Sequence, residues 1–452
     1  MKKSIIVFLL LINTNLLYSQ IYSDQLYTLN TDDMLQNIET SSGVVLSVDG
    51  KSIVLEDNLL SGYLILKPQN SAEPFNEGLP SWNGTAPHDS SSFKVQMRFP
   101  LSTGWSPWLT VGFWKANIWS NYGSTSYSGG YIDYDNVKLF SYQSSWQFKV
   151  IFERKNIKNA PPSLNKLSFF VSDSRTTSSL NYSEIINDNP PQIFIPTDFI
   201  YQYAVDPIIG PDICSPTSTS MVLKSYDIEV DPYKFAKDNY DPYFKIFGIW
   251  PRAVQNAAQY GLVGAVTRYR NWSDTYDVLA NNGRIVMSIG EPLYSGHLIM
   301  LAGFTSSGNP IVHDPAKNNG YAYVYNKSSL SHSWFDKGGV AYTLYYTDSI
   351  QVGVEKPLLS SHEFQLQQNY PNPFNPSTII SYQLPLDSYV TLKVFDILGR
   401  ELITLVNEQK PAGNYEVKFD ASSVSYKISS GIYFYALSAG DIVITKKMLL
   451  MK

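Results

Sequence analysis

Alternating apolar and polar residues dominate the region from about residue 25 to 185. Two segments, Phe93–Phe99 and Trp146–Phe152, alternate without a break, which is the pattern of a strand with one buried face. Asp49-Gly50 separates two further apolar runs, and an Asp-Gly pair in that position is a strong hairpin signal. Repeated strands with turn residues between them predict a β-sandwich over residues 25–185.

The periodicity changes after Asn189-Pro190-Pro191, which is typical of a linker. Helical spacing comes first and apolar strand segments follow, an order that predicts an α+β domain over residues 192–347. The helices are expected at Pro216–Tyr226, Pro251–Tyr260 and Asp274–Ala280, and the strands at Arg284–Ile289, His297–Phe304, Pro310–Asp314 and Gly339–Tyr346. Residues 351–362 are expected to form a second linker.

The start of the chain carries a signal for export. Lys2-Lys3, the short apolar run Ile5–Ile12 and the small residue Ser19 predict a secretory signal peptide over residues 1–19. The apolar run is too short to cross a bilayer, which takes about 20 residues, and no later segment of the sequence reaches that length. We therefore expect an exported chain without a transmembrane segment.

The last part of the chain, residues 364–452, alternates in short runs that predict a small β-sandwich of about six or seven strands. Its recognisable strings are NYPNPFNPST from Asn369, VFDILGRELITLV from Val394, SSGIYFYALSAG from Ser429 and TKKMLLMK from Thr445. These strings resemble the C-terminal sorting domain of type IX secretion substrates. The resemblance implies the type IX secretion machinery as a partner, passage across the outer membrane, and a protein that is released or attached to the cell surface. An ordinary carbohydrate-binding or adhesive sandwich is the alternative.

Composition removes several classes of function. Only 16% of the residues are charged and the net charge is −5, whereas a nucleic-acid binder needs clustered Lys and Arg. Cys214 is the one cysteine, which excludes a disulfide framework and a zinc site built from several thiolates. The five histidines lack metal-ligand spacing, and the acidic string from Asp133 lacks the glycine-punctuated loop of a calcium site. The sequence gives no indication of a metal or a cofactor.

Candidate chemistry centres on Cys214, which stands directly before a predicted helix. Unpaired N–H groups and the positive end of the helix dipole favour the nucleophilic thiolate over the thiol. His297 is a candidate base and begins one strand of a predicted hairpin. Asp314 ends the other strand, so both residues are expected at the open end of the hairpin. A carboxylate in that position can orient the imidazole. His313 is the rival base, but alternation along the strand directs it to the other face.

The order Cys, His, Asp is the papain-like arrangement, and residues 192–347 resemble the C39-like family of cysteine peptidases. The resemblance is carried by Ile195-Pro196, Tyr201-Gln202, Cys214-Ser215-Pro216-Thr217-Ser218, Trp250-Pro251, Gly296-His297 and Val312-His313-Asp314-Pro315. It implies a papain-like fold with Cys214 as the nucleophile, His297 as general base and acid, and Asp314 as the orienting residue. Gln202 matches the glutamine that forms the oxyanion hole with the Cys214 N–H. Ser215 stands where the wider family usually has glycine.

The sequence therefore predicts three modules, of which the central one hydrolyses peptide or protein substrates through a thioester acyl-enzyme. Fold alone does not separate this function from an amidase or a transglutaminase-like acyl transferase acting on cell-wall or isopeptide amides. A catalytically silent surface adhesin or glycan-binding protein is a third interpretation. The N-terminal sandwich is expected to take no part in the chemical step, because its histidine, His88, is far from Cys214 in sequence.

Overall fold

A computed structural model describes residues 24–346, apart from 88, 116–118 and 120, and residues 365–451, apart from 367–368, 370–371, 385–387, 398, 412, 425–427 and 440–441. The predicted signal peptide, the predicted linker 351–362 and His88 lie outside the described residues. The chain forms two compact units, Met1–Glu355 and Lys356–Lys452. In the described parts of the chain, no helix is both long enough and apolar enough to cross a membrane.

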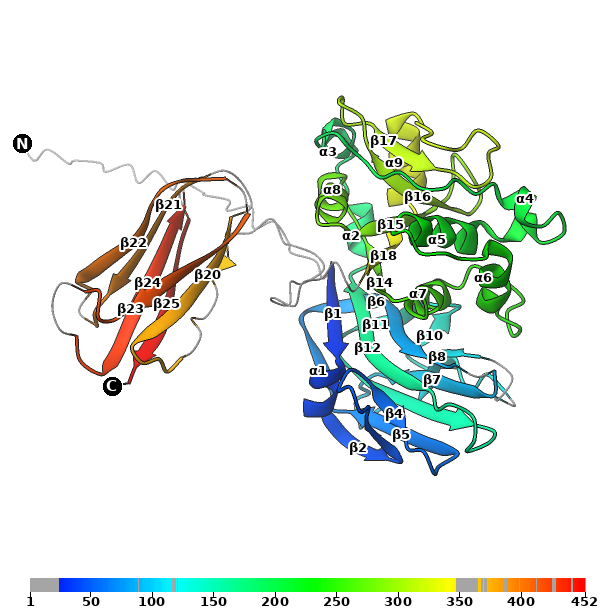
Figure 1. Ribbon diagram of the computed structural model, residues 1–452, viewed down its shortest axis with the longest axis horizontal. Coiled ribbons are helices and arrows are strands. Elements are labelled where there is room, and N and C mark those ends of the chain that lie inside the picture. Colours follow the sequence, from blue (N-terminus) through cyan, green and yellow to red (C-terminus); the bar gives the residue numbers. More distant parts are fainter. Residues whose placement is uncertain are drawn as a thin grey trace, which may run out of the picture. The chain divides into compact units, whose positions relative to one another are not determined.

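The N-terminal half of the first unit is a 12-stranded antiparallel sheet that curls around its own core (Figure 1). Its main path runs in the order β2-β5-β11-β6-β12-β4-β3. The strands are β1 (Asp24–Asn30), β2 (Ile38–Ser42), β3 (Val44–Leu46), β4 (Ile53–Leu55), β5 (Ser61–Leu66), β6 (Gln69–Thr85), β7 (Ser91–Arg98), β8 (Leu109–Trp114), β9 (Ser126–Tyr127), β10 (Gly130–Asp133), β11 (Asn136–Arg154) and β12 (Ser163–Ser172). Helix α1 (Thr31–Gln36) follows β1, and α2 (Arg175–Ser178) and α3 (Tyr182–Asn187) follow β12.

The sequence predicted two separate sheets here, but the structure joins them into one. The reason is the length of β6 and β11, which have 17 and 19 residues. The first part of β11 pairs with β10, and the last part pairs with β5 and β7. Register shifts near Gln143 interrupt the pairing of β11 with β6, and such bulges bend a strand. Alternation reveals which face of a strand is buried, but not that the strand continues through a bend.

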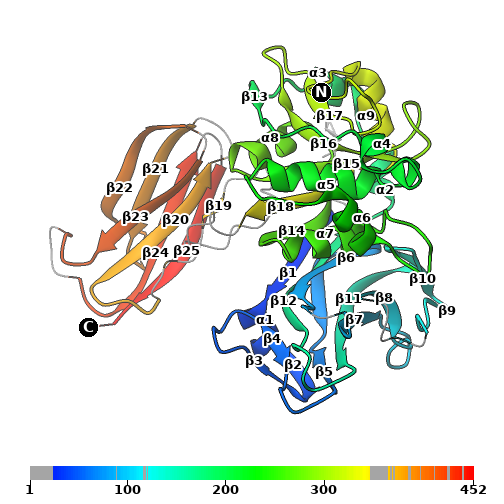
Figure 2. The ribbon, with the colours of Figure 1, turned by 45° about the vertical axis from the view of Figure 1, so that its right-hand side comes forward.

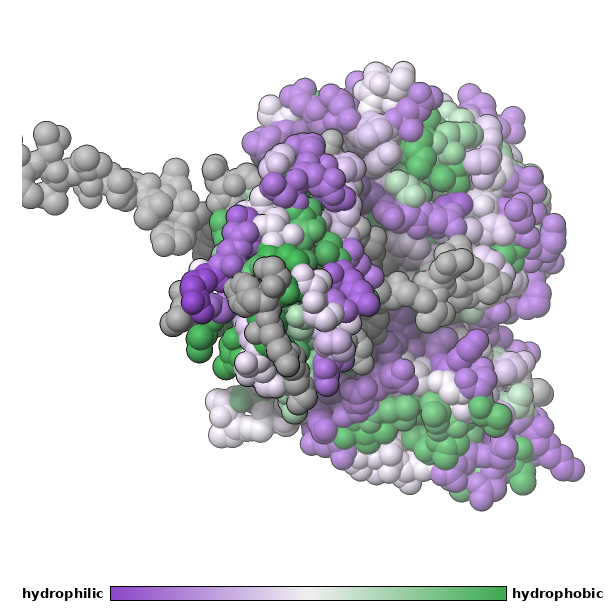
Figure 3. Space-filling model, turned by 60° about the vertical axis from the view of Figure 1, so that its left-hand side comes forward, coloured by the Kyte–Doolittle hydropathy of each residue, from purple (hydrophilic) through white to green (hydrophobic). Residues whose placement is uncertain are grey.

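Tryptophans of the N-terminal half divide between the core and the surface. Trp82, Trp114 and Trp146 are fully buried. Trp105 and Trp108 are half-buried, and the guanidinium of Arg98 lies 5.2 and 4.4 Å from their ring centres. Figure 3 shows apolar residues interspersed with polar ones on the displayed face of this half. Most of the tryptophan surface therefore serves packing.

The central domain is an α+β unit built on a six-stranded sheet in the order β13-β16-β15-β18-β14, with β17 paired to β16. Its strands are β13 (Ile193–Phe194), β14 (Leu262–Arg268), β15 (Arg284–Ile289), β16 (His297–Phe304), β17 (Pro310–His313) and β18 (Val340–Tyr346). Its helices are α4 (Gln202–Val205), the 3₁₀ helix η2 (Gly210–Asp212), α5 (Cys214–Lys224), α6 (Pro232–Asn239), α7 (Trp250–Ala258), α8 (Ser273–Ala280) and α9 (Lys327–Phe335). Helix α5 packs against β15 and β16 (Figure 2), and this contact positions the candidate site.

The two halves of the first unit meet where β14 and α7 pack on β6 (Figures 1 and 2). Strand β14 is an edge of the central sheet, so its outer N–H groups need partners from elsewhere. The Asn83 amide oxygen accepts from Gly264 N–H at 3.0 Å, and the Ser81 hydroxyl accepts from Val266 N–H at 3.0 Å. Side chains of the N-terminal half therefore complete the edge of the central sheet.

Helix α7 adds a second set of bonds across this interface. The buried Arg252 guanidinium donates to the carbonyl of Phe113 at 2.9 Å, and Gln255 Nε2 donates to the carbonyl of Gly84 at 2.6 Å. At the start of the helix, Trp250 N–H donates to the carboxylate of Asp135 at 2.7 Å. Asp135 lies at the tip of the β10–β11 hairpin, so this hairpin reaches from the N-terminal half into the central domain.

The second unit contains two small antiparallel sheets, β19-β20-β23 and β22-β21-β24-β25. Its strands are β19 (Gln365–Leu366), β20 (Ser377–Leu384), β21 (Ser388–Phe395), β22 (Glu401–Lys410), β23 (Gly413–Asp420), β24 (Gly431–Ala439) and β25 (Ile442–Leu450). Ile380 and Phe419 of the first sheet share one hydrophobic cluster with Leu392 and Tyr435 of the second. Two small sheets thus enclose a common core, as the alternation of this region predicts.

Candidate active site

Cys214 is the first residue of α5. The residue before it, Ile213, provides no side-chain cap, so the first N–H groups of the helix remain available to a negative charge near the sulfur. Pro216 fits the first turn because the N–H that proline lacks has no partner there in any case. Every residue from Ser215 to Leu223 is buried. The helix is therefore packed against other residues around its whole circumference, while the cysteine at its first position is half-buried.

His297 is the first residue of β16, and its ring contacts both other residues of the predicted triad. Its Nε2 lies 2.8 Å from a carboxylate oxygen of Asp314, and Cys214 is near enough to be one of the groups that raise its pKa. Burial by itself would lower the pKa of His297, but the hydrogen bonds and the charges of Asp314 and Cys214 outweigh burial and raise it to about 9. The imidazolium form is therefore favoured beside the sulfur.

Asp314 follows β17 directly and is fully buried. Besides His297, its carboxylate accepts hydrogen bonds from Tyr294 Oη at 2.9 Å, from Tyr325 Oη and from Ala316 N–H at 2.9 Å. Burial would raise the pKa of Asp314, but the bonds from His297, Tyr325 and Ala316 outweigh it and lower the pKa. The carboxylate is therefore held ionised and in one orientation against the imidazole.

The sequence analysis did not identify the two tyrosines. Tyr294 precedes His297 by three residues, and its ring lies 4.2 Å from the imidazole centre. Tyr325 lies beyond the hairpin, and its hydroxyl is 3.2 Å from that of Tyr294. No sequence spacing connects these tyrosines with Asp314. The only sequence signal is that Tyr294 stands three residues before the candidate base His297.

His313 makes its contacts with residues other than Cys214, His297 and Asp314. It is fully buried, its Nδ1 accepts from Ala322 N–H at 3.1 Å, and its Nε2 lies 3.2 Å from the carbonyl of Ile195. Its ring stacks on Tyr321 with 4.7 Å between centres. An imidazole that accepts at one nitrogen and donates at the other is neutral, and burial lowers the pKa of His313. Its contacts are structural.

The register of the β16–β17 hairpin places the side chain of Asp314 against His297. The register shifts between Leu301 and Gly303, after which His313 pairs with Met300. Gly303 has φ +146°, and a Cβ there would lie 1.9 Å from the carbonyl oxygen of Ile193, so only glycine allows this close approach. Asp314 thus comes just beyond the paired segment, where its side chain reaches the start of β16.

Gln202 is placed near the candidate site, but its amide is engaged elsewhere. Its backbone N–H donates to the carbonyl of Pro315 at 2.9 Å, which places Gln202 next to the turn after Asp314. Its buried Nε2 donates to the carbonyl of Gly210 at 2.7 Å. Among the described residues, no hydrogen bond joins its side chain with Cys214. One hydrogen of the amide remains for another acceptor.

Ser215 has a definite partner that explains its presence after Cys214. Its fully buried hydroxyl lies 2.8 Å from the hydroxyl of Tyr342 on β18. This bond links the first turn of α5 to the strand beneath it. A glycine at this position would leave the buried Tyr342 hydroxyl without that partner, and such a loss typically costs about 1–3 kcal/mol.

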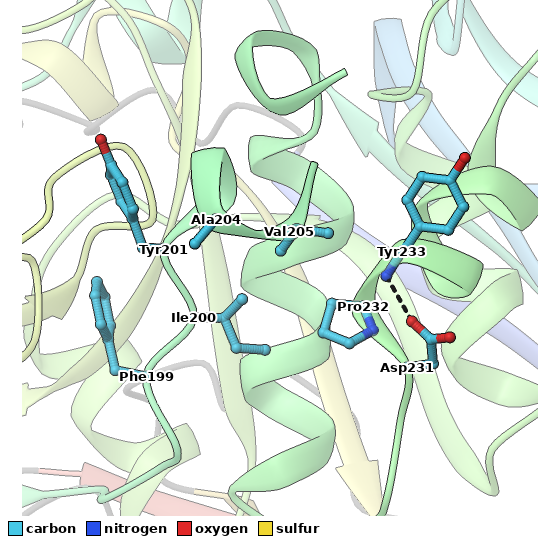
Figure 4. A pocket seen from close by; sticks show the side chains of 8 residues that line it. All are labelled: Phe199, Ile200, Tyr201, Ala204, Val205, Asp231, Pro232 and Tyr233. Carbon is cyan, nitrogen blue, oxygen red and sulfur yellow. Dashed lines mark hydrogen bonds between the residues drawn. The ribbon is translucent and has the colours of Figure 1, made fainter. Parts of the chain in front are cut away.

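A pocket of about 330 Å³ lies close to Gln202, between α4 and the start of α6 (Figure 4). Its lining is mostly apolar and aromatic: Phe199, Ile200, Tyr201, Ala204, Val205, Asp231, Pro232 and Tyr233. The one carboxylate, that of Asp231, accepts from Tyr233 N–H at 2.9 Å and caps α6. The pocket offers apolar surface near the turn that carries Asp314, and it is not itself a cluster of reactive groups.

Two family comparisons agree with these observations. Residues 194–342 match the Peptidase C39 like family, so the chain contains a C39-like peptidase domain. Residues 368–451 match the secretion system C-terminal sorting domain, so the chain also contains the sorting domain that its C-terminal strings resemble. Both resemblances stated from the sequence are confirmed. A comparison with curated proteins gives no match.

The solved structures that are similar to this chain include three with low TM-scores. A double glycine motif protease from an AMS/PCAT transporter, in complex with the leader peptide, has 18% identity and a TM-score of 0.24, with 33% of this chain and 92% of that chain covered. Dimeric latent PorU from Porphyromonas gingivalis has 11% identity and a TM-score of 0.18, with 95% and 34% covered. A Faecalibacterium prausnitzii beta-glucuronidase has 8% identity and a TM-score of 0.16, with 87% and 38% covered.

Proposed function

We propose that this chain is an exported cysteine peptidase that hydrolyses peptide bonds through Cys214, His297 and Asp314. The observation that carries the proposal is the position of the His297 ring, whose Nε2 lies 2.8 Å from Asp314 and whose pKa is raised by both Asp314 and Cys214. Nucleophile, base and orienting residue in contact are the signature of covalent acyl transfer. The C39-like peptidase domain that contains all three residues supports the same function.

In the proposed reaction, the Cys214 sulfur attacks the carbonyl carbon of the scissile amide. The backbone N–H of Cys214 and the remaining amide hydrogen of Gln202 stabilise the oxyanion. The C–N bond breaks as His297 gives its proton to the leaving nitrogen, which leaves a thioester on Cys214. His297 then removes a proton from water, the hydroxide displaces the sulfur, and the acid product departs. Asp314 keeps its negative charge throughout and orients the ring.

Peptide hydrolysis is tested by incubating the exported chain with a diverse peptide library and locating the cleavage sites by mass spectrometry. We expect new peptide ends with wild-type protein and none with Cys214→Ala, which serves as the matched control. A thiol-directed probe should label Cys214 in acidic buffer, where an unassisted thiol reacts slowly. Absence of both cleavage and labelling would contradict the proposal and would favour a silent surface protein.

Activity should depend on pH in a way that follows the pKa of His297. The imidazolium donates the proton to the leaving nitrogen, so kcat/KM should fall as pH rises through about 9, the raised pKa of His297. In Asp314→Ala the bond and charge that raise this pKa are lost, so the alkaline limb should move down towards about 6.5, the ordinary value for histidine. The measurement is kcat/KM between pH 5 and pH 10. An alkaline limb that stays in place in Asp314→Ala would show that the two residues do not act together.

Export should depend on the C-terminal unit. The sorting domain is expected to direct the chain across the outer membrane, and the two units are separately compact. Deletion of residues 364–452 should therefore leave a folded first unit in the periplasm, as measured by cell fractionation and by an unchanged thermal unfolding transition. As a control, residues 364–452 fused to an unrelated periplasmic protein should export that protein. Normal surface delivery of the shortened chain would contradict this assignment.

A further inference from the structure

A lysine that the sequence analysis did not consider lies beside the candidate active site. Lys337 follows α9, its side chain is exposed, and its Nζ donates to the carbonyl of Ile289 at 3.2 Å. Ile289 is the residue of β15 directly paired with His297 of β16. A Cβ at Gly296, the residue before His297, would lie 3.7 Å from the Lys337 Nζ. The ammonium is therefore adjacent to the backbone that carries His297.

The Lys337 ammonium faces negative groups without pairing with one. Among the described residues no carboxylate forms an ion pair with it, and its one hydrogen bond goes to a backbone carbonyl, which leaves donors free. Partial exclusion of water lowers the pKa of Lys337, whereas the charges of Cys214 and Asp135 act in the opposite direction. Gly290 and Gly296 flank the side chain and add no bulk of their own. The cation is available to a further partner.

Asp135 brings the N-terminal half to the same place. Its carboxylate is nearly buried at the tip of the β10–β11 hairpin and accepts from Trp250 N–H, which fixes it at the start of α7. Burial raises the pKa of Asp135 to about 7, and the charge of Lys337 acts against this rise.

The reaction geometry indicates which part of a substrate would meet Lys337. His297 gives its proton to the leaving nitrogen, so the residue on the leaving side of the scissile bond must lie near His297. Gly296 directly precedes His297, and the Lys337 ammonium lies beside Gly296 and the carbonyl of Ile289. An ammonium with free donors recognises a carboxylate best.

We propose that Lys337 is a specificity-determining residue that binds a carboxylate of the residue directly after the scissile bond. This inference rests on the proposed function. The carboxylate belongs either to an aspartate or glutamate side chain, or to the free end of a peptide whose last residue is the leaving group.

The test uses the exported full chain and the best-cleaved peptide from the library described above. The residue after the scissile bond is replaced by Glu, Gln or Lys, and a further pair ends at this position with a free carboxylate or with a carboxamide. With wild-type protein, kcat/KM should be about tenfold to a hundredfold higher for each carboxylate than for its amide, the range of a charge-assisted hydrogen bond. The Glu/Gln pair and the terminal pair show which source of carboxylate is used.

In Lys337→Met the carboxylate-to-amide ratio should fall towards 1, and in Lys337→Glu the Lys peptide should become the better substrate. Lys51→Met, a change at an exposed lysine of the N-terminal half, should keep the wild-type ratio. Equal cleavage of acid and amide peptides by wild-type protein, or an equal loss for both in Lys337→Met, would overturn this inference alone. A wild-type protein that cleaves no peptide overturns the proposed function, and this inference with it.

Discussion

Replacement of Cys214 or of His297 by alanine is expected to reduce turnover by roughly three or more powers of ten. The double variant should be hardly slower than either single variant, because both side chains serve one step and the loss of either already prevents it. The basis is the bond from His297 to Asp314 and the interaction of Cys214 with the His297 imidazole, which helps to raise its pKa. The measurement is kcat on the best library peptide for the wild type, the two single variants and the double variant.

Two other histidines provide controls for this prediction. His332 is exposed and stacks on Tyr182, so His332→Ala should keep the wild-type kcat. His313 bonds to backbone groups in the core, so His313→Ala should lower the free energy of unfolding by about 1–3 kcal/mol while kcat per folded molecule is retained. If His313→Ala abolished turnover and His297→Ala did not, the assignment of the base would be wrong.

Removal of the N-terminal half is expected to have the second large effect. A chain restricted to residues 190–350 should aggregate or unfold without a cooperative transition. Its β14 edge would lose the Asn83 and Ser81 side chains that pair it, and unpaired edges promote association. The buried face of α7, which packs against β6, would also be exposed to water. The measurements are the solubility of the shortened chain and its thermal unfolding by circular dichroism.

A point variant tests the same interface within the full chain. Asn83→Ala leaves the buried Gly264 N–H without its acceptor, which should lower the free energy of unfolding by about 1–3 kcal/mol. An exposed amide offers a matched control: Gln25→Ala, at an exposed site on β1, should change the free energy of unfolding by no more than about 0.5 kcal/mol. A soluble 190–350 chain with a cooperative transition and the full kcat would contradict this prediction and would support an independent central domain.

Much of the candidate site could be predicted because its determinants are local. A helix start at Pro216 and a tight hairpin around residues 305–309 are visible in the sequence, and alternation along the strand separates His313 from Asp314. The hairpin places His297 and Asp314 near one another, whereas the approach of Cys214 to them was implied by the family resemblance. The structure starts α5 at Cys214 itself, two residues before the predicted helix, so that Pro216 lies in the first turn, where its missing N–H costs no hydrogen bond.

The remaining features depend on contacts between distant segments, which no local pattern encodes. Tyr325 reaches Asp314 from beyond the hairpin, and Lys337 reaches the site from the end of α9. The bend of β11 depends on which strands pair with each of its ends. The docking of the N-terminal half could not be predicted either. Ser81 and Asn83 look like ordinary polar residues of a strand, and only the structure shows that their side-chain oxygens accept hydrogen bonds from N–H groups of the β14 edge.

The shared interface also determines how such an enzyme can be matured. Many hydrolases are made as zymogens and become active when an N-terminal region is cut off and diffuses away. Here a cut between β12 and β13 would leave both fragments joined by the bonds at β6, β14 and α7, so the nicked protein would keep its N-terminal half. If the proposed peptidase is controlled by proteolysis, we therefore expect the controlling cut to lie elsewhere in the chain, with the N-terminal half retained beside the central domain.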